Sequence, residues 1–279
     1  MKKISRRSFL AAAGLSVAAL ALTACGGSSA STASSVASSA ASSEAASTSA
    51  AAGELATVEA GKLTMATNAT FPPYEMTTDA GEFEGIDIET AQAIADKLGL
   101  ELQIDDMDFD AALLSVQQGK ADIVMAGVTV TDERKAVMDF SDSYATGIQS
   151  IIVPEGSDIA SPDDLAGKKI GTQRGTTGYI YCSDDFGDEN VVAYDDGLTA
   201  VQALNNGQVD AVVIDNAPAK EFVAANPGLV ILDTSYAEED YAIGMAKGSS
   251  LEAAVNAALK ELKADGTLQS IVDKYITAE

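Results

Sequence analysis

The sequence contains no histidine and no tryptophan, and only two cysteines among its 279 residues. Without histidine, the side chain that most often performs acid–base catalysis near neutral pH is missing, and so is the commonest metal ligand. Two cysteines do not make a disulfide framework. These absences exclude histidine-based acid–base catalysis and histidine metal sites. We expect no catalytic residue, no metal site and no cofactor.

Basic residues are also scarce. The net charge of −25 leaves no room for the positive patch that a nucleic-acid partner requires. Beyond the amino-terminal segment, no apolar run is long enough to span a bilayer. The 47% hydrophobic content suits a folded globular protein with an acidic surface.

Residues 1–24 have the pattern of a lipoprotein signal peptide. Four basic residues precede an apolar segment, 9–22, which is too short to be a membrane span. The residues leading to Cys25 resemble a lipobox, which would make Cys25 the lipid anchor; ordinary secretory cleavage near Cys25 is the alternative. Residues 5–10 also resemble a twin-arginine signal, so the export route stays open.

Residues 25–53 are almost entirely Ser, Ala, Gly and Thr after the cysteine. Such a segment cannot bury enough apolar surface to fold, and we expect a disordered tether. The protein is then expected outside the cytoplasm, held by lipid at the outer face of the cell membrane.

The rest of the chain alternates between buried-strand and helix patterns, which predicts an α/β fold. Expected strands are 62–67, 100–104, 121–125, 148–153, 169–173, 191–194, 208–214, 229–232 and 241–245. Expected helices are 87–98, 109–119, a short one after Ser161, one ending at 206, 251–262 and 268–275. In parallel sheets ligands bind beyond the carboxyl ends of the strands, so the segments that follow strands are the candidates.

The most informative of these segments is 126–134. It follows a buried strand and offers Gly127, Thr129 and Arg134. Beyond the leader the chain has 11 Lys but only two Arg, Arg134 and Arg174. An arginine fork suits a carboxylate bidentately, which a lysine cannot match. A surface arginine that closes a loop is the alternative.

Two further strand ends carry groups that suit ligand groups of opposite charge. The glycine-rich turn with Thr176 and Thr177 opens a helix, and its free N–H groups suit an anion. Asp215 ends a buried strand, where its carboxylate can hold an ammonium or cap the next helix. Residues 116–124 also resemble 204–212, which indicates two lobes with similar wiring unless the similarity is chance.

Three motifs together resemble those of a known family: Gly-x-Thr-x-Thr-x-x-Arg at 127–134, Asp-Phe-Ser-Asp-Ser-Tyr at 139–144 and Asp-Ala-Val-Val-Ile-Asp at 210–215. It is the polar amino-acid family of extracellular solute-binding proteins, the receptors of ABC importers, and the match covers roughly 61–276. The resemblance implies a two-lobed periplasmic-binding-protein-like α/β fold. Each lobe would have a mainly parallel sheet, two hinge strands would join the lobes, and the ligand cleft would lie between them. Lobe 1 would comprise 54–146 and 241–279, and lobe 2 would comprise 147–240.

The resemblance also implies residue roles. Those expected at the ligand carboxylate are Gly127, Thr129, Arg134, Thr176 and Thr177. Asp215, with Gly127, would hold the ammonium. The side chain would meet Asn68, Phe71, Phe109, Gln173 and Ile214, and the uncharged Asn68 and Gln173 favour a polar, uncharged side chain. We interpret Asp87 as a helix cap and Tyr74 as packing under its loop.

The resulting expectation is a monomeric receptor, not an enzyme, that captures a free L-amino acid and delivers it to the permease subunits of an ABC importer. The alternatives are a small-acid dehydratase-like enzyme, with Asp215 or Glu75 as acid or base, and a ligand sensor on the same scaffold.

Overall fold

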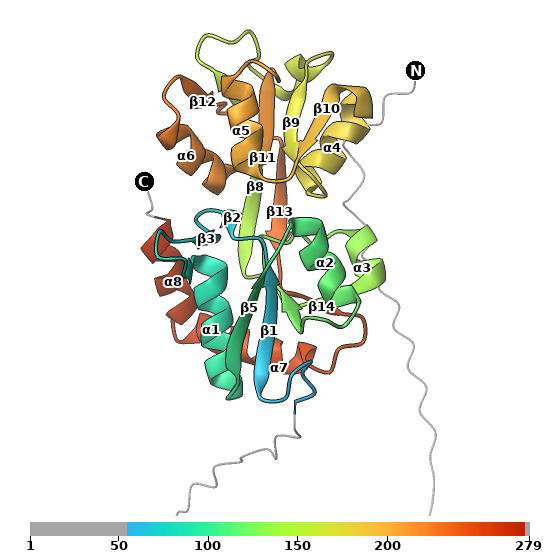
Figure 1. Cartoon of the computed structure of the whole chain (residues 1–279), viewed down its shortest axis with the longest axis vertical. Helices are drawn as coiled ribbons and strands as arrows, with labels where there is room; N and C mark the ends of the chain where they lie inside the picture. Colours follow the sequence, from blue (N-terminus) through green and yellow to red (C-terminus); the bar gives the residue numbers. More distant parts are fainter. Residues whose placement is uncertain (1–54, 277–279) are drawn as a thin grey trace, which may run out of the picture. The chain divides into compact units, whose positions relative to one another are not determined.

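The computed structural model describes residues 55–276, which belong to one body of mixed α/β structure (Figure 1). The expected signal peptide (1–24), the anchor Cys25 and the tether lie outside the described residues. Within 55–276, none of the helices combines the length and the hydrophobicity needed to cross a membrane.

The first lobe is built on a sheet with strand order β5-β1-β6-β14-β7. Its strands are β1 (Lys62–Thr67), β5 (Glu101–Asp106), β6 (Ile123–Val124), β7 (Met138–Phe140) and β14 (Gly244–Ala246). Its helices are α1 (Ile86–Leu98), α2 (Phe109–Gln117), α3 (Asp132–Val137), α7 (Glu252–Ala264) and α8 (Thr267–Tyr275). A small antiparallel sheet, β2 (Thr70–Phe71), β3 (Glu75–Thr77) and β4 (Phe83–Glu84), follows β1.

The second lobe is built on a sheet with order β10-β9-β11-β8-β12, and β13 also pairs with β8. Its strands are β8 (Ala145–Pro154), β9 (Ile170–Gln173), β10 (Val191–Tyr194), β11 (Ala211–Asp215), β12 (Leu229–Ile231) and β13 (Ala237–Tyr241). Its helices are η1 (Pro162–Leu165), α4 (Thr177–Phe186), η2 (Asp188–Asn190), α5 (Gly197–Asn205) and α6 (Asn216–Ala225).

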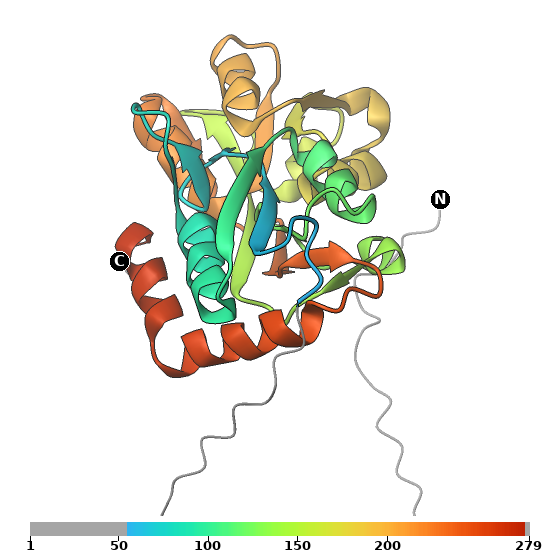
Figure 2. The same cartoon turned by 60° about the horizontal axis from the view of Figure 1, so that its bottom comes forward.

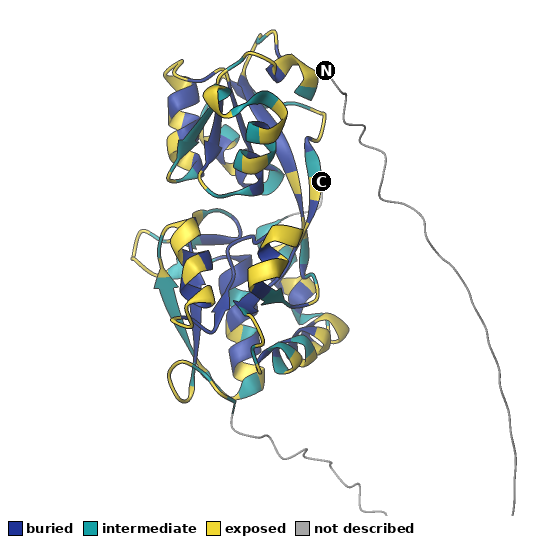
Figure 3. Ribbon diagram, turned by 90° about the vertical axis from the view of Figure 1, so that its right-hand side faces the viewer, coloured by how far each residue is buried: buried dark blue, intermediate teal, exposed yellow. Residues whose placement is uncertain are grey.

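Helices cover both faces of each sheet, which explains the near-continuous apolar runs of the strands. In the first lobe, α1, α7 and α8 pack together on one face, whereas α2 covers the other (Figure 2). In the second lobe, α5 and α6 cover one face, and α4 with η1 covers the other. The central strands are accordingly mostly buried, whereas exposed residues lie on the outer helix surfaces and on loops (Figure 3).

Two strands carry the chain between the lobes. β8 leaves the first lobe and β13 returns to it, and the two pair in antiparallel register from Ala145↔Tyr241 to Gln149↔Ala237 (Figure 1). The single strand expected at 241–245 is in fact two, because β13 ends at Tyr241 and β14 begins at Gly244. The structure therefore has a hinge of two paired strands.

The α/β fold class is confirmed, but the sheets are mixed rather than mainly parallel. β1 pairs in parallel with β5 and β6, and β9 pairs in parallel with β10 and β11. All pairs made by β8 and β14 are antiparallel. The reason is topological: strands that enter a lobe from the hinge run against those that belong to βαβ units.

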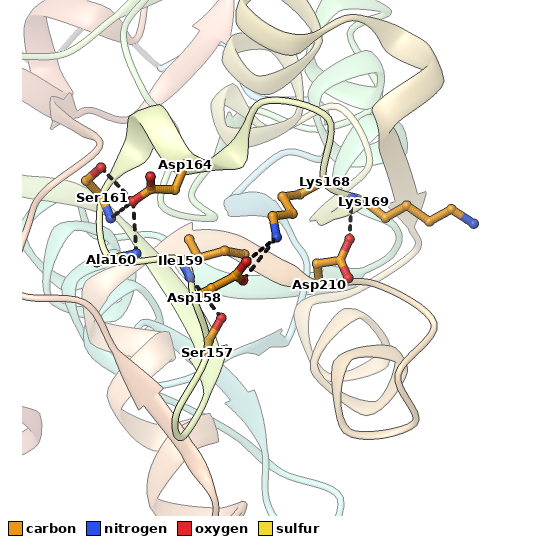
Figure 4. Close-up of polar contacts among 9 residues, drawn as sticks. All are labelled: Ser157, Asp158, Ile159, Ala160, Ser161, Asp164, Lys168, Lys169 and Asp210. Atoms are coloured by element: carbon orange, nitrogen blue, oxygen red, sulfur yellow. Dashed lines mark hydrogen bonds and ion pairs between the residues drawn. The ribbon is translucent and has the colours of Figure 1, made fainter.

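The repeat between 116–124 and 204–212 has a structural counterpart. Both helices end at a glycine of positive φ, Gly119 at +66° and Gly207 at +67°. The following aspartate then ties the neighbouring parallel strand. Asp122 accepts from the Thr64 N–H at 2.8 Å, and Asp210 accepts from the Lys169 N–H at 2.7 Å (Figure 4).

The segment before β9 holds the expected short helix. Ser161 and Asp164 form a capping box at the start of η1, in which the Asp164 carboxylate accepts from the Ser161 N–H at 3.0 Å (Figure 4). Lys168 then pairs with Asp158 at 2.9 Å. These exposed contacts fix the entry of β9, whose carboxyl end reaches the cleft.

Candidate functional site

All eleven ligand-contact residues expected from the sequence line one cavity between the two lobes. The first lobe and its loops contribute Asn68, Phe71, Phe109, Gly127, Thr129 and Arg134. The second lobe contributes Gln173, Thr176, Thr177, Ile214 and Asp215. The cavity also has lining residues that the sequence did not place there: Glu75, Ala126, Gln149 and Tyr241.

Arg134 is buried at 9% exposure, so the alternative of a surface arginine is wrong. α3 presents it, and the helix begins where the Thr131 hydroxyl accepts from the Arg134 N–H. The guanidinium donates to the Thr129 carbonyl at 2.9 Å and to the Gly175 carbonyl of the other lobe at 3.1 Å. Its carbon lies 5.3 Å from the centre of the Phe109 ring. Burial lowers the pKa of Arg134, but the group keeps its charge, and unused donors remain for an anion.

The turn at 174–178 opens α4 as expected. The Thr176 hydroxyl caps the helix by accepting from the Tyr179 N–H, so α4 starts at Thr177 with its first N–H groups free of intrahelical partners. Gly175 has φ +74°, and a Cβ there would lie 1.7 Å from the Asp110 carboxylate of α2. The lobes thus meet closely here, and a helix amino terminus stands beside Arg134.

Asp215 lies at the carboxyl end of β11 and is 2% exposed. One oxygen caps α6 by accepting from the Ala217 N–H at 2.9 Å, which confirms the capping alternative. The other accepts from the Ile148 N–H at 2.8 Å and from the Tyr241 hydroxyl at 3.0 Å. Burial raises its pKa to about 6, with a smaller contribution from the Glu239 charge, and no Lys or Arg of residues 55–276 forms an ion pair with it. A buried carboxylate without a cation is a natural site for a positively charged ligand group.

Asn68 and Gln173 meet across the cleft. The Gln173 amide donates to the Asn68 side-chain oxygen at 2.8 Å, and the Asn68 amide donates to the Met107 carbonyl at 3.0 Å. Phe71 and Ile214 supply apolar wall at the same cavity. Tyr74 is 3% exposed and stacks on Phe71 at 5.8 Å, so it packs under the loop as expected.

Asp87 is not a helix cap. The amino-terminal cap of α1 is Gly85, which makes no side-chain cap. The Asp87 carboxylate instead accepts from the Gly127 N–H at 3.0 Å and from the Tyr144 hydroxyl at 2.8 Å, and it thereby holds the segment that enters the site. The prediction failed because its partners lie 40 and 57 residues away. Burial raises the pKa of Asp87 to about 6.

Glu75 adds a second buried acid to the cavity wall. It is fully buried, and its carboxyl group lies within hydrogen-bonding reach of the Asp87 carboxylate. Burial raises its pKa well above the usual range, and the neighbouring Asp87 charge raises it further. The sequence offered Glu75 only as a possible enzyme acid. The structure places it beside Phe71, because the two residues are paired between β2 and β3.

A third acid, Glu239 on β13, contacts three residues of the cavity wall. Its Oε2 accepts from the hydroxyls of Thr129 and Thr177 and from the Gln149 amide, each at 3.0 Å. The sequence did not distinguish Glu239 from its acidic neighbours at 238 and 240. Which of the three is buried depends on the pairing of β13 with β8. Within 55–276, no cluster of cysteine and acidic side chains is arranged to hold a metal ion.

Comparison with known proteins places the chain in a family. The model of the bacterial extracellular solute-binding proteins, family 3, matches residues 63–278. The L-cystine-binding protein TcyJ of Escherichia coli (strain K12) is 34% identical over 226 residues, which are 79% of this chain and 85% of that protein.

Two solved structures are similar over the same part of the chain. An ancestral arginine-binding protein bound to arginine is 43% identical, with a TM-score of 0.74 over 77% of this chain and 98% of that one. An ancestral arginine-binding protein bound to glutamine is 42% identical, with a TM-score of 0.75 over 79% of this chain and 100% of that one. The chain therefore belongs to the bacterial extracellular solute-binding proteins, family 3.

Proposed function

We propose that the protein is an extracytoplasmic receptor that captures a free L-amino acid between its lobes and delivers it to an ABC importer. The observation that carries the proposal is the pairing of opposite charges in one cavity. Arg134 and the amino terminus of α4 lie on its wall together with the buried, cation-free Asp215. An α-amino acid carries the two complementary charges on one carbon.

In this proposal the carboxylate binds to Arg134 and to the backbone N–H groups of Thr129 and Thr177, while Gly127 and Thr176 line the same cavity. Charge-assisted hydrogen bonds of this kind are about twice as strong as neutral ones, and water is excluded from a closed cleft. Asp215 holds the ammonium. A ligand that lacks either group would leave a buried charge unpaired, which costs several kcal/mol.

The side-chain end of the cavity combines apolar walls with acceptors. Phe71, Phe109 and Ile214 enclose the space, and Asn68 and Gln173 provide amides. The sequence favoured a polar, uncharged ligand side chain from these amides. Glu75 lines the same cavity and, together with Asn68 and Gln173, provides oxygen acceptors for a side chain with several N–H donors. L-Arginine is the first candidate, and L-glutamine is the second.

The relatives support this range, since they include an L-cystine-binding protein and ancestral arginine-binding proteins bound to arginine and to glutamine. We further propose a monomer, anchored by lipid on Cys25 to the outer face of the membrane, with lobes at 54–146 plus 241–279 and at 147–240. A receptor on a tether of residues 25–53 can reach the permease subunits of its importer while it stays at the membrane.

A thermal-shift screen of the full chain against the common amino acids and small carboxylic acids tests the proposal. We expect an increase in melting temperature with free α-amino acids, largest for L-arginine or L-glutamine, because ligand binds only the folded state. Acids that lack an amine should give no shift.

Arg134→Ala should abolish the shift, because the carboxylate loses its cation. Arg174→Ala is the matched control: its side chain is 56% exposed and makes only surface contacts to Ala193 and Asp195. A full shift in Arg134→Ala, or no shift with any amino acid in the unmodified protein, would remove the proposed function.

A further inference from the structure

Glu239 connects both lobes with the hinge through one oxygen. Thr129 belongs to the first lobe, Thr177 begins α4 in the second, and Gln149 lies on the hinge strand β8; all three donate to Oε2 at 3.0 Å. Glu239 itself lies on the other hinge strand, β13, and is 6% exposed. Each of the three donor residues is also buried and lines the cavity.

The number of available protons fixes the direction of these bonds. A carboxylate only accepts, and a threonine hydroxyl has a single proton to donate. Since both hydroxyls lie 3.0 Å from Oε2, each points its proton at Glu239. The two hydroxyl oxygens are 3.4 Å apart, and neither has a proton left for the other. Only their lone pairs can therefore face a ligand.

We propose that Glu239 is a positioning residue that sets the hydrogen-bond polarity of the site, and that it thereby contributes to selection of a ligand ammonium. Because their protons point at Glu239, the hydroxyls of Thr129 and Thr177 can accept hydrogen bonds from N–H donors, and they repel another acceptor. The corner they form is then complementary to an ammonium group, in the cavity that Asp215 also lines. The ligand carboxylate depends on Arg134 and backbone N–H groups rather than on these hydroxyls. This inference rests on the proposed amino-acid function.

A glutamine at 239 would remove the constraint at nearly constant volume. The amide has one acceptor oxygen and one donor nitrogen, so one hydroxyl or amide now faces a donor instead of an acceptor. A threonine hydroxyl that receives such a bond can turn its proton toward the cavity. Glu238 is the matched control, because it is the adjacent residue of β13, carries the same charge and is exposed.

The test compares binding of two ligands by calorimetry in the full chain. The first pair is L-arginine and 5-guanidinopentanoic acid, which is arginine without its amino group; L-glutamine and its deaminated analogue form the second. The unmodified protein should prefer the amino acid of at least one pair strongly. Glu239→Gln should weaken the amino acid about tenfold or more and leave the deaminated acid unchanged or tighter. Glu238→Gln should keep both affinities.

A purely structural role for Glu239 makes a different prediction. Loosening of the hinge would weaken both members of a pair by the same factor, and that result, or an unchanged preference in Glu239→Gln, would overturn the inference. Failure of the unmodified protein to bind any of the amino acids would instead overturn the proposed function, and the inference with it.

Discussion

At the residue scale, the two charged groups of the cavity differ in how the protein satisfies them. Arg134 is held by two backbone carbonyls and by the ring of Phe109, so its position is fixed before a ligand arrives. Asp215 has three neutral donors and no cation. The protein therefore carries an unfavourable buried charge in its empty state, which a ligand ammonium relieves.

This burial predicts a pH dependence of stability. The pKa of Asp215 rises from 3.8 to about 6 on folding, so between these values the folded state holds a proton that the unfolded chain has lost. The contribution of Asp215 to stability is thus most favourable at low pH and decreases as the pH rises through about 6. Asp215→Asn removes it. Relative to that variant, the unmodified protein should lose up to about 3 kcal/mol of unfolding free energy between pH 4 and pH 7.

Urea denaturation of both proteins without ligand across this range measures the difference. Asp79→Asn, at an exposed turn residue, is the control and should leave the pH profile unchanged. If the unfolding free energies of Asp215→Asn and the unmodified protein change in parallel with pH, the buried Asp215 carboxylate does not lower stability at high pH.

At the element scale, the hinge strands β8 and β13 both connect the lobes and contribute to the site. Gln149 of β8, and Glu239 and Tyr241 of β13, contact or line the cavity. Tyr241 is 1% exposed, packs edge-on against Tyr74 at 5.4 Å and donates to Asp215. Any change in strand pairing here is transmitted directly to the ammonium site.

Gly147→Ala is the sharpest probe of that pairing. A Cβ at this position would lie 2.4 Å from Cζ of the Tyr241 ring, which is too well packed to move aside. We expect a loss of about 1–3 kcal/mol in unfolding free energy, as is typical of overpacking, together with weaker ligand binding. Thr146→Ala, at the adjacent exposed residue, should change neither. Chemical denaturation and calorimetry measure the two effects, and an unaffected Gly147→Ala would show that the ring is free to shift.

The sequence predicted most elements because their signals are local. Strands 62–67 and 191–194 match β1 and β10, and the helix at 268–275 differs from α8 by one residue. What it missed depends on distant partners. Nothing near Asp87 reveals Gly127, and nothing near Glu239 reveals Thr129, 110 residues away. The candidate site residues were predicted through a family motif, and the structure brings them to one cavity, whereas Glu239 and the partners of Asp87 required the fold.

At the scale of the whole molecule, the charge of −25 surrounds the cleft with a negative field. Such a field attracts cationic ligands at low ionic strength, and it is screened as salt is added. The Debye length falls from about 30 Å at 0.01 M to about 3 Å at 1 M ionic strength. The effect should therefore distinguish ligands of different net charge that are otherwise alike.

L-Arginine and its neutral isostere L-citrulline make this comparison. We expect the affinity for L-arginine to fall as sodium chloride rises from about 10 mM to about 1 M, whereas the affinity for L-citrulline should change little. Calorimetry at four or five salt concentrations gives both slopes. Equal slopes would mean that the local acids of the cavity, rather than the global charge, govern the preference for cations.

The position of β14 has a consequence for synthesis. This strand lies between β6 and β7 in the first sheet, yet its residues 244–246 come after the entire second sheet in the chain. A chain that emerges from its amino terminus can thus complete the second lobe, which is continuous from β8 to β13, while the first sheet still lacks a central strand. We expect the lobe that starts later in the chain to be the first to finish folding.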